Sequence, residues 1–218
     1  MIKTAIFDLD GTLVDTLGDM HVTLNRALHD MGLPRVERHE LLGFIGGGVD
    51  DLLVLATKGV TCDLVRLKQR YGEYYRDHAH LTSSLFPGVE SGLTTLRQAG
   101  ITLGVLTNKP ERSAHHLLHT IGAMHWFVKV AGPDTYGCHK PNPDGLLALM
   151  QEMGASPATT VMVGDADTDI LAGRGANVAT IAVTYGYRSS DELGVYQPTV
   201  MATTFSEAVG VIMNPTFG

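Results

Sequence analysis

Short apolar runs, rich in β-branched residues, recur along this chain with helical stretches between them. The runs cover residues 4–8, 101–107, 127–132, 160–165 and 178–184. They are too continuously apolar for strands with one face in water, which indicates strands that are covered on both faces. The helical stretches between them are residues 89–100, 110–122 and 143–154. Strands that alternate with helices predict an α/β fold with a doubly wound parallel sheet.

One interval is much longer than this alternation requires. About 70 residues separate the first apolar run from the helix that leads into the second, whereas a crossover needs only about a dozen. Apolar residues recur in it at helical spacing, at Leu17, Met20, Leu24, Leu28 and Met31, and residues 49–59 and 63–81 also have a helical pattern. We therefore expect an inserted, small, all-helical cap domain of residues 15–83, able to hinge on a core of residues 1–14 and 84–218.

The charge balance argues against polyanionic partners. The chain has 16 Lys and Arg against 23 Asp and Glu, a formal net charge of −7, and 44% hydrophobic residues. We expect no nucleic-acid partner and no anionic membrane partner. No apolar run approaches the roughly 18 residues of a membrane span. A cytoplasmic protein is the resulting expectation, and the oligomeric state stays open between monomer and homodimer.

Polar side chains gather where the predicted strands end. The first run ends at Asp8, the second at Thr107 and Asn108, and the fourth at Asp165. In parallel sheets of this kind, ligands bind beyond the carboxyl ends of the strands. One such residue alone is ordinary for a loop between strand and helix. Three strand ends at one edge favour a binding site, and further acids lie nearby at Asp10, Asp167 and Asp169.

So many carboxylates in one cleft repel one another unless a cation neutralises them. The absence of His and Cys from the group favours Mg²⁺, which prefers hard oxygen ligands, over zinc. A magnesium ion that keeps some of its water also binds phosphate oxygens, and Lys140, in a loop before the last predicted crossover helix, adds a positive charge. The pattern therefore indicates a Mg²⁺ site that receives a phosphorylated compound.

Four ordered segments carry a family resemblance. They are "DLDGTLVDT" (8–16), "LTNK" (106–109), "KP" (140–141) and "GDADTD" (164–169). Together they resemble the four motifs of the haloacid dehalogenase superfamily of phosphohydrolases, in order and in approximate spacing. The segments "IGGGVDDLL" (45–53), "KPNPD" (140–144) and "VTYGYR" (183–188) are similar to the phosphoglycolate phosphatase branch, which carries a helical cap after its first motif.

The resemblance implies a role for each residue at the strand ends. Asp8 would attack phosphorus and form an aspartyl phosphate. Asp10 would protonate the leaving alkoxide and then deprotonate the incoming water; the acid at this position separates phosphatases from the dehalogenases of this fold. The Thr107 hydroxyl and the backbone amide of Asn108 would bind phosphoryl oxygens. Lys140 would stabilise the charge that develops on the transferred group.

The metal ligands implied by the resemblance come from the same segments. Asp8, the backbone carbonyl of Asp10, and Asp165 would hold Mg²⁺, with Asp169 as a further ligand or as a neighbour of the ligands. Asp167 stands at a position that varies in the family motif, so we interpret it as a favourable charge at a helix N-terminus.

The predicted cap contains a run of three glycines, Gly46, Gly47 and Gly48, before a predicted helix. They form either a substrate-specificity loop, whose amides bind the non-phosphate end of a small anion, or a flexible turn between helices. The functional interpretation depends mainly on the resemblance.

Three cap tyrosines and one arginine are open to two interpretations each. Tyr71, Tyr74 and Tyr75 either form an aromatic wall over the ligand or pack a small helical core, and the second is the more common arrangement. Arg188, in the last of the similar segments, either reaches a substrate anion or only flanks the cleft.

The sequence analysis therefore favours a Mg²⁺-dependent phosphatase of a small phosphomonoester metabolite, with 2-phosphoglycolate as the leading candidate. One alternative is a hexose phosphate mutase of the same fold, which shares the helical cap. Another, from a different class, is a phospho-accepting receiver module for signalling. The long insertion and the second aspartate, Asp10, argue against the receiver module.

Overall fold

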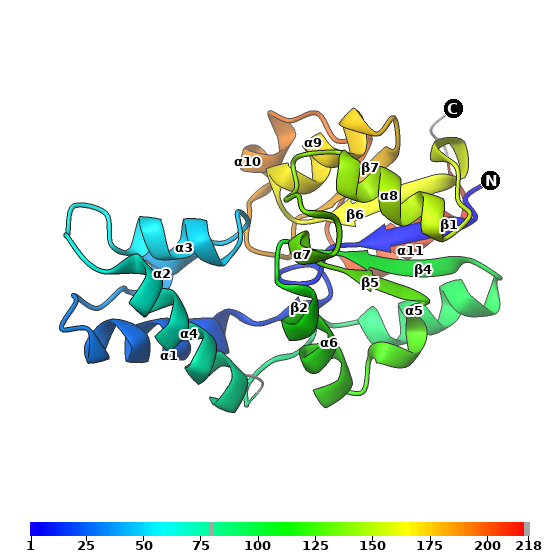
Figure 1. Ribbon diagram of the computed structural model, residues 1–218. Coiled ribbons are helices and arrows are strands. Elements are labelled where there is room, and N and C mark those ends of the chain that lie inside the picture. Colours follow the sequence, from blue (N-terminus) through cyan, green and yellow to red (C-terminus); the bar gives the residue numbers. More distant parts are fainter. Residues whose placement is uncertain (79–80, 216–218) are drawn as a thin grey trace.

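The computed structural model describes residues 1–78 and 81–215. A six-stranded parallel sheet forms its centre, in the order β5-β4-β1-β6-β7-β8 (Figure 1). Its strands are β1 (Thr4–Phe7), β4 (Thr102–Leu106), β5 (Lys129–Ala131), β6 (Thr160–Gly164), β7 (Ala179–Val183) and β8 (Val200–Ala202). The predicted α/β fold with a parallel sheet is confirmed, and each of the five predicted apolar runs contains a strand.

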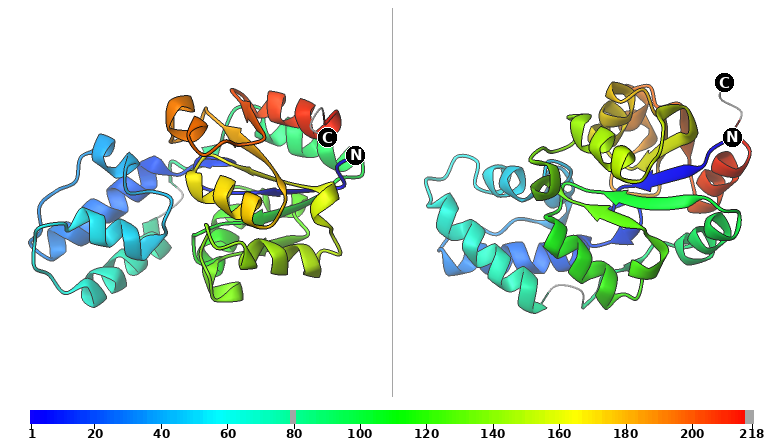
Figure 2. Two further views of the ribbon diagram at one scale, coloured as in Figure 1. Left: turned by 90° about the horizontal axis from the view of Figure 1, so that it is seen from above. Right: turned by 45° about the vertical axis from the view of Figure 1, so that its right-hand side comes forward.

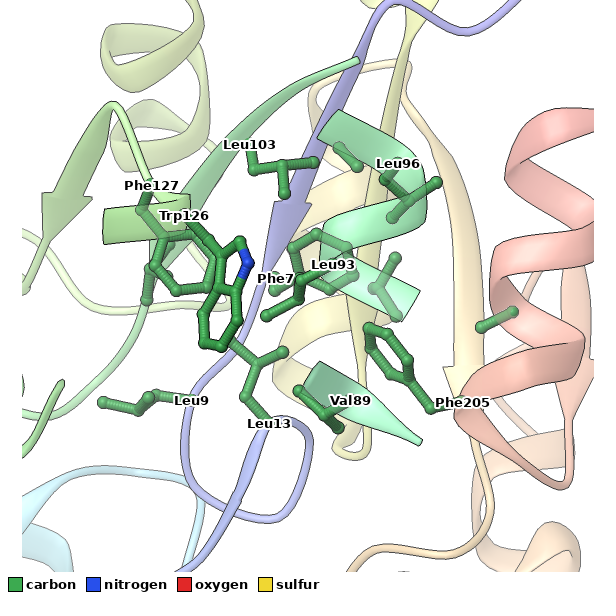
Figure 3. Packing of buried hydrophobic residues seen from close by; sticks show 14 of the residues in the cluster. Phe7, Leu9, Leu13, Val89, Leu93, Leu96, Leu103, Trp126, Phe127 and Phe205 are labelled. Carbon is green, nitrogen blue, oxygen red and sulfur yellow. The ribbon is translucent and has the colours of Figure 1, made fainter. Parts of the chain in front are cut away.

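Helices cover both faces of this sheet, as its uniformly apolar strands require. Ile6 and Phe7 are neighbours on β1, point to opposite faces and are fully buried. Phe7 packs in the largest apolar cluster with side chains such as Leu93 and Phe205 (Figure 3), whereas Ile6 packs with Leu149. The helices of the core are α5 (Val89–Gln98), α6 (Glu111–Thr120), α7 (Pro133–Tyr136), α8 (Asp144–Glu152), α9 (Asp167–Gly175), α10 (Ser190–Gly194) and α11 (Phe205–Met213), with 3-10 turns at Met124–Trp126 and Pro157–Thr159.

Three elements beyond residue 184 have no counterpart among the predicted runs, namely β8, α10 and α11. Strand β8 lies at the edge of the sheet, and its apolar run, Val200–Ala202, is only three residues long, which is shorter than the runs that identify a strand from sequence. Helix α11 carried a readable signal, because Phe205, Ala208, Val209 and Ile212 recur at helical spacing and are buried.

The described residues of the inserted segment form four helices beside the sheet (Figures 1 and 2). They are α1 (Leu17–Asp30), α2 (Arg38–Leu42), α3 (Val49–Ala56) and α4 (Leu64–His78). They bury an apolar cluster of their own, which includes Leu24, Leu28, Leu53 and Leu67. The last predicted helix extended to residue 81, and residues 79 and 80 lie outside the described part. No described helix is long and apolar enough to cross a membrane.

Two short antiparallel strands, β2 (Val14–Asp15) and β3 (Ser84–Leu85), connect the helical segment to the sheet. Asp19, in the first turn of α1, fixes the return segment, because its carboxylate accepts hydrogen bonds from the backbone and hydroxyl groups of Thr82 and Ser83. These bonds outweigh burial and lower the Asp19 pKa. We retain residues 15–83 as the proposed extent of the cap domain.

Candidate active site

Three buried carboxylates meet at the carboxyl ends of the central strands. Asp8 follows β1, Asp165 follows β6, and Asp169 lies in the first turn of α9. One oxygen from each lies within 4.8 Å of the others. Strands β1 and β6 are parallel neighbours, with Phe7 paired to Val163, so the fold brings together acids that are more than 150 residues apart.

Lys140 lies between two of these acids. Its ammonium group donates to Oδ1 of Asp8 at 2.7 Å, to Oδ1 of Asp169 at 2.7 Å and to the Leu106 carbonyl at 2.8 Å. These bonds use all three ammonium donors and fix the group in place. Burial alone would lower the Lys140 pKa, but the charges of Asp169 and Asp8 outweigh it and raise the pKa. No described residue donates a hydrogen bond to Oδ2 of Asp8, so that oxygen is available to a ligand.

The Asn108 side chain holds the loop that carries Lys140. Its amide oxygen accepts from the Lys140 backbone N–H at 2.8 Å, and its amide nitrogen donates to the Lys140 carbonyl at 2.9 Å. The same nitrogen donates to the Gly46 carbonyl of the cap at 2.7 Å. The side chain of Asn108 therefore joins β4, the Lys140 loop and the cap, which leaves only its backbone amide for the predicted contact with substrate.

Asp165 is the most perturbed acid of the group. Burial raises its pKa to about 8, together with repulsion from Asp8 and Asp169, although hydrogen bonds from the Tyr187 backbone and the Thr12 hydroxyl oppose the rise. The Asp169 pKa is also raised, mainly by burial, despite its bond to Lys140. One lysine does not neutralise three acids, so this cluster of oxygen donors fits a divalent cation.

Glycine is required at position 11, where the chain turns after β1. Gly11 has φ +88°, in the left-handed region, and an added Cβ would overlap the Asp165 carboxylate. The turn begins directly after Asp10, so Asp10 lies where the chain leaves the sheet.

Asp10 forms an ion pair with a residue that the sequence analysis overlooked. The Lys109 ammonium donates to both Asp10 oxygens, at 2.7 and 2.8 Å, and the Thr16 hydroxyl donates to Oδ1 at 2.6 Å. The Lys109 pKa is raised, because the charge of Asp10 outweighs burial. Lys109 also lies 4.9 Å from the ring centre of Tyr75 on α4. The sequence feature that could have identified Lys109 is its position in "LTNK", directly after the Asn at the end of a strand.

Thr107 lies at the end of β4, buried beside the acids. Its hydroxyl accepts a hydrogen bond from the Lys109 backbone N–H at 3.1 Å. Accepting this bond uses a lone pair, so the hydroxyl proton is still available for donation to a ligand.

The glycine run of the cap lies directly against the core. Gly46 accepts the bond from Asn108, and Gly48 has φ +94°. A Cβ on Gly48 would lie 3.1 Å from the Asn108 carbonyl and 3.3 Å from the His139 ring, so this position needs glycine for both reasons. Gly47 instead faces Asp51, in the first turn of α3. Binding of substrate by the amides of this run stays a prediction.

Arg188 spans the gap between core and cap. Its guanidinium donates to the carbonyls of Leu42 and Ile45, at 2.7 and 3.0 Å. This arginine, for which we considered a contact with a substrate anion, therefore holds the loop that precedes the glycine run. The neighbouring Tyr187 hydroxyl accepts from the Thr16 backbone N–H at 2.8 Å, which adds a second contact between the core and the hinge segment.

A cavity of about 530 Å³ lies between the acids and the cap. Tyr71 and Tyr75 of α4 line it, with stacked rings 5.9 Å apart, and both also belong to the apolar cluster of the cap. These two tyrosines therefore both line the ligand cavity and pack the core of the cap. Tyr74 points elsewhere, because its hydroxyl bonds to Asp30.

Comparison with known proteins agrees with this geometry. The family model described as haloacid dehalogenase-like hydrolase matches residues 5–183. A phosphoglycolate phosphatase of Vibrio parahaemolyticus is 34% identical, over 97% of this chain and 96% of its own length. A probable phosphatase, IndB, of Dickeya dadantii is 36% identical, over 96% and 93%.

Solved structures show the same architecture. The crystal structure of a predicted phosphoglycolate phosphatase from Haemophilus somnus has a TM-score of 0.91 and 30% identity, with coverage of 96% of this chain and 97% of that one. The strand-end carboxylates, the lysine between them and these similarities lead to one assignment: the chain belongs to the haloacid dehalogenase-like hydrolase family.

Proposed function

We propose that the protein is a Mg²⁺-dependent phosphatase that hydrolyses a small phosphomonoester, with 2-phosphoglycolate as the leading candidate. The observation that carries the proposal is the position of Asp8, which has one oxygen fixed by Lys140 and the other free, within 4.8 Å of ligand oxygens of Asp165 and Asp169. Relatives named as phosphoglycolate phosphatases over nearly the whole chain support the choice of substrate.

Asp8 and Asp165 are the proposed metal ligands, together with the Asp10 backbone carbonyl. Asp169 is the weaker candidate, because its oxygens already accept from Lys140 and from the Ala166 backbone N–H. A bound Mg²⁺ would supply the positive charge that these acids and the phosphoryl oxygens require.

In the first half-reaction, an oxygen of Asp8 forms a bond to phosphorus while the bond from phosphorus to the ester oxygen breaks. The leaving oxygen takes a proton from Asp10. In the second half-reaction Asp10 takes a proton from water, whose oxygen attacks phosphorus. The bond between phosphorus and Asp8 then breaks, which releases inorganic phosphate and restores the carboxylate.

Lys140 and Thr107 act on the transferred group in both steps. The Lys140 ammonium is already oriented by three bonds, so it stabilises developing negative charge without a further cost of reorganisation. Asp10 as found is an ion-paired carboxylate, the form needed for the base. Its role as an acid requires that it gains a proton and loosens its contact with Lys109 before the first step.

Release of inorganic phosphate from 2-phosphoglycolate tests this proposal. We expect multiple turnover by the wild type and none by Asp8→Asn, which keeps the size of the side chain but removes the nucleophile. A circular dichroism spectrum equal to that of the wild type would show that the variant is folded. Turnover by the folded Asp8→Asn variant would contradict the mechanism.

The mutase alternative has a separate test. A hexose phosphate mutase would interconvert isomers of a glucose phosphate without net release of phosphate. Family membership favours a hydrolase over the receiver module, and repeated turnover of a phosphomonoester would exclude the latter. The cytoplasmic location stays a prediction.

A further inference from the structure

The cavity is larger than the leading substrate requires. At about 30 Å³ for each water-sized group, its volume of about 530 Å³ has room for on the order of 18 such groups. Phosphoglycolate has only about nine non-hydrogen atoms, so it would fill roughly half of this space.

The cavity is not large because the cap has moved away from the core. On one side, Asn108 and Arg188 bond to the Gly46 and Ile45 carbonyls of the cap loop. On another, Lys109 of the core lies against Tyr75 of α4. The cap therefore contacts the core beside the acids while the cavity is present.

One complete face of α4 lines the cavity, with Lys68, Tyr71, Gly72, Tyr75 and Arg76 at spacings of three and four. Gly72 stands in the middle of this face and inside the helix, where glycine is less stable than alanine. Its φ is not positive, and a Cβ there would meet no heavy atom within 4 Å. Neither backbone conformation nor close packing explains this glycine. A bare helix surface at this point leaves space for a ligand.

Further apolar side chains, from Ile45, Val49 and Leu52, line the cavity opposite the catalytic acids. Two exposed arginines lie on its wall, Arg76 near the end of α4 and Arg112 at the start of α6. Neither makes an ion pair or hydrogen bond with any residue in the described ranges, whereas Lys68 pairs with Asp50. Two cations at one cavity, Arg76 from the cap and Arg112 from the core, favour an anionic group there in a protein of net charge −7.

We infer that the enzyme also acts on phosphomonoesters larger than 2-phosphoglycolate, with an extended apolar or aromatic body and a second anionic group at the end remote from the phosphate. The body lies along Tyr71, Gly72 and Tyr75, and the second anion contacts Arg76 and Arg112. This inference rests on the proposed phosphatase activity and defines its substrate class.

Three phosphate esters test the apolar part of the cavity: phosphoglycolate, phenyl phosphate and 4-carboxyphenyl phosphate. Gly72→Leu fills the space beside the two tyrosines. We expect kcat/KM for both aryl esters to fall at least tenfold, and that for phosphoglycolate to stay within about twofold of wild type. Gly72→Ala is the control for the fold, and its melting temperature should rise by roughly 1–4 °C because alanine is the better helix former.

The double variant Arg76→Gln/Arg112→Gln tests the second anion. We expect its KM for 4-carboxyphenyl phosphate to rise about tenfold, with KM for phenyl phosphate within about twofold of wild type. Comparing each substrate between variant and wild type cancels the different acidities of the leaving groups.

An equal decrease in kcat/KM for all three esters, in either variant, would overturn the inference. Unchanged kcat/KM for the two aryl esters in Gly72→Leu would also overturn it. Those results would leave the phosphatase activity itself intact. If the wild type released phosphate from none of the three esters, that result would instead contradict the proposed function.

Discussion

At the scale of single residues, the pairing of Lys109 with Asp10 is the contact with most influence on the chemistry. The two residues are 99 positions apart, and both side chains are nearly buried, at 7% and 12% exposed. The ammonium holds the Asp10 carboxylate beside Thr16, in the segment that joins the core to the cap. A residue outside the predicted catalytic set therefore positions the proposed acid and base.

Replacing Lys109 by Met should lower kcat/KM, because Asp10 loses the ammonium group that bonds to both of its oxygens. Removal of one partner from such a buried pair should also lower the free energy of unfolding by about 3 kcal/mol. Phosphate release and urea unfolding measure the two effects.

Lys109→Arg keeps the positive charge and is the matched control, with kcat/KM close to that of wild type. The double variant Asp10→Asn/Lys109→Met leaves no unpaired charge and should regain part of the lost stability. A single Lys109→Met variant with wild-type stability and wild-type kcat/KM would refute the coupling.

Asp165 makes the stability of the metal-free protein depend on pH. Its pKa is about 8 in the folded chain against 3.8 for an aspartate in water, so between these pH values the folded state holds a proton that the unfolded state has lost. Stability from this group is therefore present at low pH and is lost as pH rises toward 8. We expect the unfolding free energy in EDTA to fall between pH 5 and pH 8.

Asp165→Asn should make this pH dependence shallower. The amide loses one hydrogen bond, from Thr12 or from Tyr187, at every pH. The quantity to compare is therefore the slope of the unfolding free energy against pH, and not the unfolding free energy at one pH. An equally steep slope in the variant would assign the dependence to other groups.

At the scale of elements, the glycine run joins the cap to the end of β4. Replacing Gly48 by Ala should lower the unfolding free energy by about 1–3 kcal/mol, since φ +94° is unfavourable for a residue with a side chain. It should also reduce kcat/KM, because the new Cβ pushes the loop away from Asn108 and His139. Thermal unfolding and phosphate release measure these effects.

Gly59→Ala is the matched control for this element. Gly59 has φ +84° in the same cap, but a Cβ there meets no heavy atom within 4 Å. Its replacement should cost similar stability and leave kcat/KM unchanged. Equal loss of activity in both variants would show that strain in the cap, and not the contact with the core, limits turnover.

At the scale of the whole molecule, the insertion and the sheet form one site. The core supplies Asp8, Lys140 and Asp165, and the cap supplies the opposite wall of the cavity. Neither part alone encloses a phosphate ester, so enclosure away from bulk water depends on both.

Removal of divalent metal should abolish turnover and lower the melting temperature, and Mg²⁺ should restore both. The stabilisation by Mg²⁺ should be larger at pH 8 than at pH 6, because protons compete with the metal for the Asp165 carboxylate. Thermal unfolding at a series of Mg²⁺ concentrations measures this. Full turnover in excess EDTA would exclude the proposed metal dependence.

Local patterns in the sequence were enough to predict the alternation of strands and helices, the inserted helices and the acids at the strand ends, since these depend on periodicity and on residues adjacent to each strand. They did not reveal strand β8, whose apolar run of three residues is too short to identify a strand.

Which charges meet depends on the tertiary structure. It paired Lys109 with Asp10, used Arg188 to hold the cap loop and placed Gly72 at an open cavity wall. These contacts join segments that are distant in the chain, and their geometry follows from how the helices pack on the sheet, which no local pattern of residues specifies.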